Sequence, residues 1–107
     1  MKKAILFAVA AADLVKAKLA VESALNAQLN AHESEYRGGE YFRVEHNGTN
    51  LVLQQNFEED DGEPTEAEFP HAEIILYVDG EERDVDVVCA TLSTSRCIKE
   101  LLRSSVY

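Results

Sequence analysis

Several residue types are scarce in this chain. Its 107 residues include no Trp, one Met, two Pro and two Cys, and only 10 Lys and Arg stand against 20 Asp and Glu, for a formal net charge of -10. So few cations argue against general binding to nucleic acid or to an anionic membrane, because both depend on Lys and Arg. No apolar run approaches the ~20 residues of a membrane-spanning helix. The chain is nonetheless 46% hydrophobic, which predicts one folded domain over residues 1–107 with a mainly aliphatic core.

The N-terminal segment resembles a signal peptide, and the two cysteines of the chain lie in its C-terminal part. A basic start at residues 1–3 and an apolar stretch at 4–12 imitate a secretion signal, but charged residues follow at once from Asp13, so we expect this segment to belong to the fold. Cys89 and Cys97 have no second pair and no His at ligand spacing. They predict neither zinc nor a disulfide framework, and favour reduced, partly buried cysteines in a cytoplasmic protein.

The first half of the chain predicts a strand, a helix and a hairpin. Residues 4–9 fit a buried strand or the first turns of a longer helix, and we favour the strand because one helix to residue 31 would be about 45 Å long. An alanine-rich amphipathic helix is expected over residues 11–31, before glycines at 38 and 39. Asn47-Gly48 is a preferred two-residue type I′ turn. A hairpin centred there pairs His46 with Thr49, Val44 with Leu51 and Phe42 with Leu53 on one face, and leaves Tyr41, Arg43, Glu45, Asn50, Val52 and Gln54 on a mostly polar face.

The second half predicts a loop, two strands and a helix. Residues 58–68, called the acidic loop below, hold seven acids and no Leu, Ile, Val or aromatic residue, so we expect them to be exposed. Residues 72–78 read as a strand, Asp79-Gly80 as a turn, residues 84–89 as a return strand, and the segment from Ser93 or Thr94 to Leu102 as a final helix. The whole predicts an α+β domain with a four- or five-stranded, mostly antiparallel sheet and two helices packed on it.

The negative charge is confined to one segment. Residues 58–86 hold 13 acids and one base, a charge of -12, while the other 78 residues hold 7 acids and 9 bases, a charge of +2. A function that depends on charge therefore belongs to this segment. The candidate partner-binding residues are Glu58, Glu59, Asp60, Asp61, Glu63, Glu66, Glu68, Asp79, Glu81, Glu82, Asp84 and Asp86.

No motif in the chain identifies a reaction, a metal or a cofactor. Aligning Gly62 with the sixth position of an EF-hand loop leaves Phe57, which cannot be a ligand, at the first position. His32, His46 and His71 are scattered and lack motif partners, so we interpret them as structural. The acids lie in segments expected to be solvated, where a carboxylate does not acquire the shifted pKa that acid-base catalysis uses. We therefore expect neither enzymatic activity nor a cofactor.

Two interpretations of the acidic segment remain open. It can be a solvated region that keeps a small protein in solution. Alternatively, if the acidic loop folds toward residues 79–86, the acids form one docking surface that steers a basic partner, with Tyr77, Phe69 or Tyr36 as aromatic anchors.

In size, acidity, α+β layout and lack of a catalytic signature, the chain resembles the small bacterial immunity proteins of contact-dependent growth inhibition and other polymorphic toxin systems. The resemblance implies a cytosolic protein that binds a cognate toxin domain, often a basic nuclease, through residues 58–68 and 79–86. The charge balance given above independently argues against direct contact with nucleic acid or membrane. Two alternatives stand beside it. One is a DNA-mimic inhibitor with carboxylates along an elongated face, and the other is a small enzyme or ligand-binding domain with a concave apolar pocket.

Overall fold

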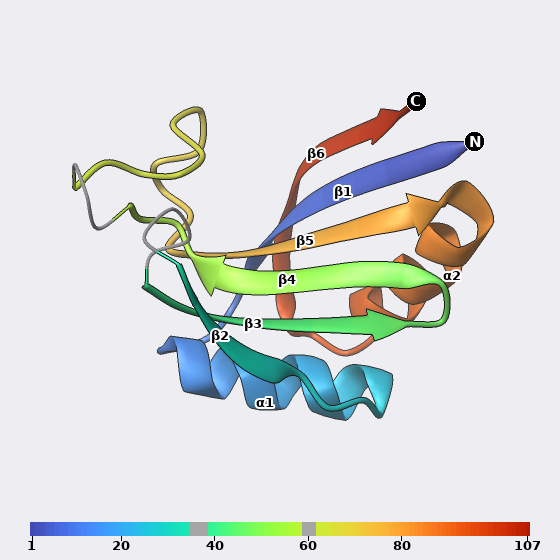
Figure 1. The fold of residues 1–107 in the computed structure, drawn as a ribbon, viewed down its shortest axis with the longest axis horizontal. Coiled ribbons are helices and arrows are strands. Elements are labelled where there is room, and N and C mark those ends of the chain that lie inside the picture. Colours follow the sequence, from blue (N-terminus) through green and yellow to red (C-terminus); the bar gives the residue numbers. More distant parts are fainter. Residues whose placement is uncertain (35–38, 59–61) are drawn as a thin grey trace.

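A six-stranded antiparallel sheet with two helices makes up the part of the chain that the computed structural model describes, namely residues 1–34, 39–58 and 62–107 (Figure 1). The strand order is β2-β3-β4-β5-β1-β6. In chain order the elements are β1 (Lys2–Val9), α1 (Leu14–Leu25), β2 (Asn30–Ser34), β3 (Gly39–His46), β4 (Thr49–Gln55), β5 (Ile74–Glu81), α2 (Glu82–Ser93) and β6 (Ile98–Val106). The α+β prediction is confirmed, but the sheet has more strands than the four or five expected.

Both helices pack on one face of the sheet. Their buried side chains join one core with alternate residues of β1, β3, β4 and β5. Leu51, Leu76 and Val78 on the strands are completely buried there, as are Val21 of α1 and Leu92 of α2. The opposite side, called the open face below, carries a small apolar cluster around Leu6 and Ile75. Polar side chains can therefore occupy the rest of the open face without entering a hydrophobic core.

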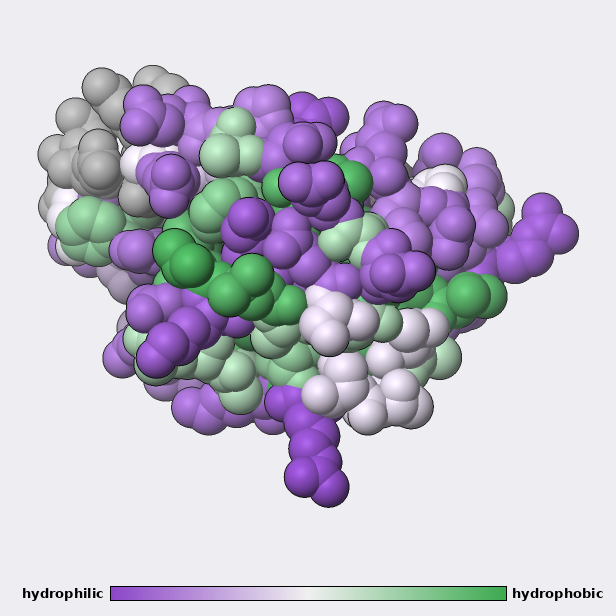
Figure 2. Space-filling model, turned by 90° about the horizontal axis from the view of Figure 1, so that it is seen from below, coloured by the Kyte–Doolittle hydropathy of each residue, from purple (hydrophilic) through white to green (hydrophobic). Residues whose placement is uncertain are grey.

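The first helix is shorter than its apolar pattern predicts. Asp13 caps its start by accepting a 2.8 Å hydrogen bond from the Lys16 backbone N–H. Asn26 ends it in the left-handed conformation at φ 53°. The residues from Asn30 onward then form the edge strand β2 rather than a further helical turn. Figure 2 shows the molecule from below, where hydrophobic side chains on the surface are interrupted by hydrophilic ones. The helix α1 exposes two large apolar side chains, Val15 and Leu19.

The first strand and the hairpin are confirmed. Residues 2–9 form β1, which lies between β5 and β6. Asn47 and Gly48 take positive φ values of 50° and 77°, as a type I′ turn requires, and join β3 to β4. The predicted register is observed, with His46 opposite Thr49 and Phe42 opposite Leu53.

The predicted return strand at residues 84–89 is wrong, because this segment belongs to the helix α2. Val85, Val88 and Leu92 are its buried residues, and their spacing of three and four follows one face of a helix. Glu82 and Asp84 lie in its first turn, where negative charge opposes the helix dipole favourably. Six residues of alternating polarity fit either structure, and burial against the core selects the helix.

The predicted Asp79-Gly80 turn and the predicted final helix are also wrong. β5 continues through both turn residues to Glu81. Gly80 is required there because a Cβ atom at this position would lie 2.6 Å from the Gly48 carbonyl oxygen. The segment from Ile98 to Val106 forms β6, which pairs with β1 and includes two register shifts. Without β6, the edge of the central strand β1 would have no hydrogen-bond partner.

Candidate binding site on the acidic loop and the open face

The structure does not bring the predicted acidic residues together. Glu81, Glu82, Asp84 and Asp86, called the helix-end acids below, lie at the end of β5 and on α2, whereas the acidic loop precedes the start of β5. The eight residues of β5, about 25 Å long at a rise of about 3.3 Å per residue, lie between the two groups in the chain, although the Glu66 side chain reaches back to Tyr77 of β5. Glu59, Asp60 and Asp61 lie outside the described residues. The chain thus has two acidic regions at opposite ends of one strand.

Two of the helix-end acids are paired with cations of the N-terminus. Glu81 lies 3.1 Å from Lys2 Nζ and 3.6 Å from the terminal amine, and Asp86 accepts a 2.7 Å hydrogen bond from Lys3 Nζ. The hydrogen bond from Lys2 holds the pKa of Glu81 below its usual value, and the bond to Asp86 raises the pKa of Lys3. These cations reduce the net charge that this region presents to a partner.

The Asn56 side chain provides one attachment of the acidic loop to the sheet. Its Nδ2 donates 2.9 Å hydrogen bonds to the carbonyl oxygens of Phe69 and Ala72, and its Oδ1 accepts a 2.7 Å bond from the Glu66 N–H. Asn56 is only 8% exposed. One buried amide thus joins the end of β4 to Glu66, Phe69 and Ala72, so this described part of the segment is held against the sheet.

Glu66 provides a second attachment, to the open face. Its carboxylate accepts a 2.8 Å hydrogen bond from Arg103 of β6 and a 2.5 Å bond from the Tyr77 hydroxyl of β5. Burial raises the pKa of Glu66, but the bonds from Arg103 and Tyr77 outweigh burial, so the pKa is lowered overall. The bond to Glu66 also raises the pKa of Arg103. Glu66 therefore serves the fold, although the sequence placed it among the partner-binding residues.

The three proposed aromatic anchors are not equivalent. The Tyr77 hydroxyl is bonded to Glu66, and Phe69 packs against the small apolar cluster of the open face. Tyr36 lies outside the described residues. Both anchors that the structure describes, Tyr77 and Phe69, therefore already contact other residues of this chain.

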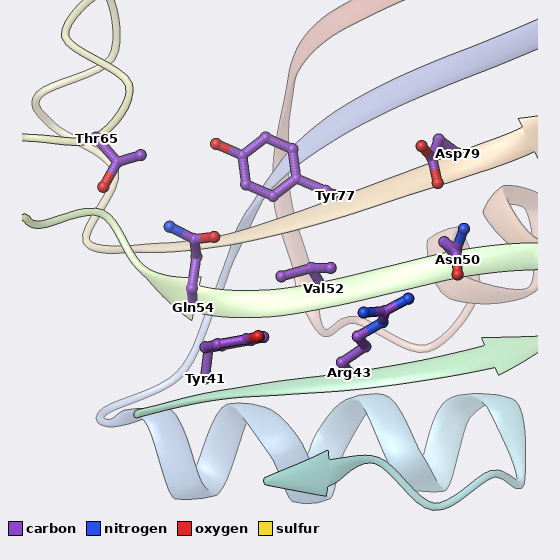
Figure 3. Close-up of a pocket in the computed structure, with 8 residues that line it drawn as sticks. All are labelled: Tyr41, Arg43, Asn50, Val52, Gln54, Thr65, Tyr77 and Asp79. Carbon is purple, nitrogen blue, oxygen red and sulfur yellow. The ribbon is translucent and has the colours of Figure 1, made fainter. Parts of the chain in front are cut away.

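Beside the acidic loop, the open face forms a polar cavity of about 560 Å³ (Figure 3). Its described lining residues come from three neighbouring strands and from the loop: Tyr41, Arg43, Asn50, Val52, Gln54, Thr65, Tyr77 and Asp79. The ligand-binding alternative required a concave apolar pocket, whereas all but one of the residues that line this cavity have a polar or charged group in the side chain. Alternation in the hairpin predicted the polar face of β3 and β4. Tyr77 was placed on a strand, but the contribution of Asp79 was missed because this residue was assigned to a turn.

The histidines and cysteines occupy separate places. His32 stacks on Tyr41 at 5.4 Å, and His71 lies 3.0 Å from a carboxylate oxygen of Glu100. Cys97 is buried and Cys89 half-buried, and burial raises the pKa of the Cys89 thiol to about 11. Among residues 1–34, 39–58 and 62–107, no three His, Cys, Asp or Glu side chains are grouped closely enough to hold a metal ion.

Comparisons with known proteins add no relative. The chain matches no family model, no curated protein and no solved structure. Within the described part of the chain, neither helix has the length and apolar character needed to cross a membrane.

Proposed function

We propose that this protein binds a basic partner protein through the acidic loop and acts as a cytosolic immunity protein that covers the active site of a toxin domain. The resemblance to toxin-immunity proteins supplies the class of partner. The acidic loop supplies the contact surface, with six carboxylates in residues 58–68 besides that of Glu66, which anchors the loop. A surface of this kind steers a cationic partner and accelerates association.

The anchoring of the acidic loop is the observation that carries the proposal. Asn56 and Glu66 tie the loop to the sheet, while the charged side chains of Glu58 and Glu68 form no salt bridge within the described residues. A restrained segment loses less conformational entropy on binding than a free one. The carboxylates of Glu58 and Glu68, which flank these attachments, are therefore suited to a basic partner.

The helix-end acids are the weaker candidate for the contact surface. Glu81 and Asp86 are paired with the N-terminus, Lys2 and Lys3, so a partner would have to compete with these cations. The separation of the two acidic regions also disfavours a DNA-mimic inhibitor, which would present one continuous row of carboxylates. A compact contact centred on the acidic loop is consistent with the pairing of the helix-end acids and with the separation of the two acidic regions.

The test is the affinity for the toxin domain encoded in the adjacent open reading frame, measured by titration calorimetry. The loop variant is E58Q/E59Q/D60N/D61N/E68Q, which retains Glu66 because Glu66 anchors the loop. We expect its affinity to fall by about 100-fold or more, since losing several charged contacts costs a few kcal/mol.

The matched control is E33Q/E40Q/E45Q/E82Q/D84N, which removes the same number of charges from residues without a salt bridge in the described part of the chain. We expect the control to bind within a few fold of the wild type. Equal losses in the two variants would refute a contact centred on the acidic loop. A neighbouring toxin domain that does not bind the wild-type chain would refute the immunity function.

A further inference from the structure

The cavity on the open face contains polar groups that the fold leaves without a partner. Asn50 Oδ1 and Thr65 Oγ1 are shielded from solvent and form no hydrogen bond with any described residue. Shielded polar atoms of this kind are uncommon in folded proteins because leaving a buried hydrogen bond unmade is costly in free energy. Both atoms belong to residues that line the cavity. A ligand that donates to them would recover this free energy.

Two charges of opposite sign line the same cavity. Arg43 lies on β3 and Asp79 on β5, with β4 between them, and neither forms a salt bridge within the described residues. Adjacent strands are about 4.8 Å apart, so the two backbones are about 10 Å apart. The extended Arg43 side chain shortens the gap between the charged groups themselves (Figure 3).

The strand register determines which groups are neighbours. Asn50 of β4 lies directly opposite Asp79, and Arg43 lies opposite Val52. Arg43, Asn50 and Asp79 are therefore gathered toward one end of the cavity, whereas Thr65 lies toward the other, as Figure 3 shows. Val52 and the Tyr77 ring lie between the two ends. The cavity has a charged end, an apolar middle and a hydroxyl at its far end.

We infer that this cavity binds a free α-amino acid. The planar guanidinium of Arg43 matches a carboxylate, which it can bind through two hydrogen bonds. Asp79 and the Asn50 Oδ1 atom are acceptors suited to the α-ammonium group. The ligand side chain then lies over Val52 toward Thr65. One cation and one anion in the same cavity favour a zwitterion over a ligand with a single charge. The volume of about 560 Å³ falls within the usual range for small-molecule sites.

This inference goes beyond the proposed function, because it concerns the open face and requires no toxin domain. It is tested with the wild-type chain and each of the common L-amino acids at millimolar concentration. The readouts are the melting temperature and the backbone amide NMR spectrum. We expect at least one amino acid to raise the melting temperature, since a ligand specific for the folded state stabilises it. The same amino acid should shift the amide signals of residues 43, 50 and 79.

Blocked ligands and substitutions make the test specific. N-acetylation or amidation of the bound amino acid should abolish binding, because each removes one of the two charges. Arg43→Gln and Asp79→Asn should each weaken binding by about 10-fold or more, as the loss of a hydrogen bond to a charged group implies. Glu45→Gln is the matched control, since Glu45 is an exposed neighbour of Arg43 on β3 that does not line the cavity.

Three outcomes would overturn the inference. The first is that no amino acid in the set changes the melting temperature or the spectrum. The second is equal binding of the blocked derivatives, which would assign the cavity to a peptide segment instead. The third is unchanged affinity in folded Arg43→Gln and Asp79→Asn variants, whose folding is checked by the dispersion of the same NMR spectra.

Discussion

Glu66 shows how one carboxylate in an acidic loop can serve the fold rather than a partner. It is among the least exposed of the loop acids, with a side chain 17% accessible, and it faces Arg103 and Tyr77 rather than solvent. Two hydrogen bonds from Arg103 and one from Tyr77 make this ion pair more robust than an isolated surface pair. The charge of Glu66 is therefore used to position the charges of its neighbours.

The pH dependence of stability follows from this arrangement. Because the pKa of Glu66 is lowered on folding, its contribution to stability is fully present above the usual pKa of a glutamate, 4.5. That contribution is lost as the pH falls through the lowered value in the folded state. We predict that Glu66→Gln lowers the free energy of unfolding at pH 7, as measured by urea denaturation. The difference from the wild type should shrink on acidification below the usual pKa, and a constant difference would contradict the assignment.

Gly80 gives a second prediction at the scale of the residue. Its φ is +155°, and a Cβ atom added there would lie 2.6 Å from the Gly48 carbonyl oxygen, which leaves no room for a side chain. We expect Gly80→Ala to lower the free energy of unfolding by about 1–3 kcal/mol, as strained backbone positions do. Gly62→Ala is the control, because Gly62 has φ +73° but a Cβ atom added there would have no neighbouring atom within 4 Å. Gly80→Ala should be the more destabilising of the two.

At the scale of the element, local turn chemistry was sufficient to predict the hairpin. Asn47-Gly48 determines the turn, and alternation on either side determines the register, with no information from distant residues. Residues 84–89 and 98–106 lack such a signal. Their apolar residues fit a helix or a strand, and the choice is made by α2 packing on the core and by β6 pairing with β1. Each was assigned to the wrong type of element for this reason.

The open-face cavity could be predicted only in part, because some of its residues come together through contacts between distant parts of the chain. Tyr41, Arg43 and Asn50 follow from the hairpin, which is local. Asp79 and Tyr77 join them through the pairing of β4 with β5, two strands that the acidic loop separates in the sequence. Thr65 depends on the attachment of that loop by Asn56 and Glu66, and a buried amide clamp has no signature in the residue pattern.

The helical state of α2 is tested at Val87, whose side chain is 59% exposed. In the middle of a helix, alanine is favoured over valine by roughly 0.5 kcal/mol, whereas an exposed strand position favours valine. We therefore predict that Val87→Ala raises the free energy of unfolding in urea. A decrease would support the strand that the sequence alone suggested. Val88→Ala, at a buried position of the same helix, should destabilise the protein in either case.

At the scale of the whole molecule, the charge of -10 divides into two regions of different character. The helix-end acids are partly neutralised by the N-terminus and two lysines, and they stabilise the junction between β1, β5 and α2. In the acidic loop, Glu66 is paired with Arg103 of β6, while Glu58 and Glu68 form no salt bridge with any described residue. The long-range field that a basic partner meets is therefore expected to be strongest on the side of the acidic loop.

The most direct measurement is the salt dependence of the association rate with the neighbouring toxin domain, followed by stopped-flow fluorescence. Electrostatic steering raises such rates by about 10-fold or more at low ionic strength, and salt screens it. We predict a steep fall of the rate with salt for the wild type and for the E33Q/E40Q/E45Q/E82Q/D84N control, and a nearly flat dependence for the E58Q/E59Q/D60N/D61N/E68Q loop variant. The same steep dependence in all three proteins would contradict a partner contact centred on the acidic loop.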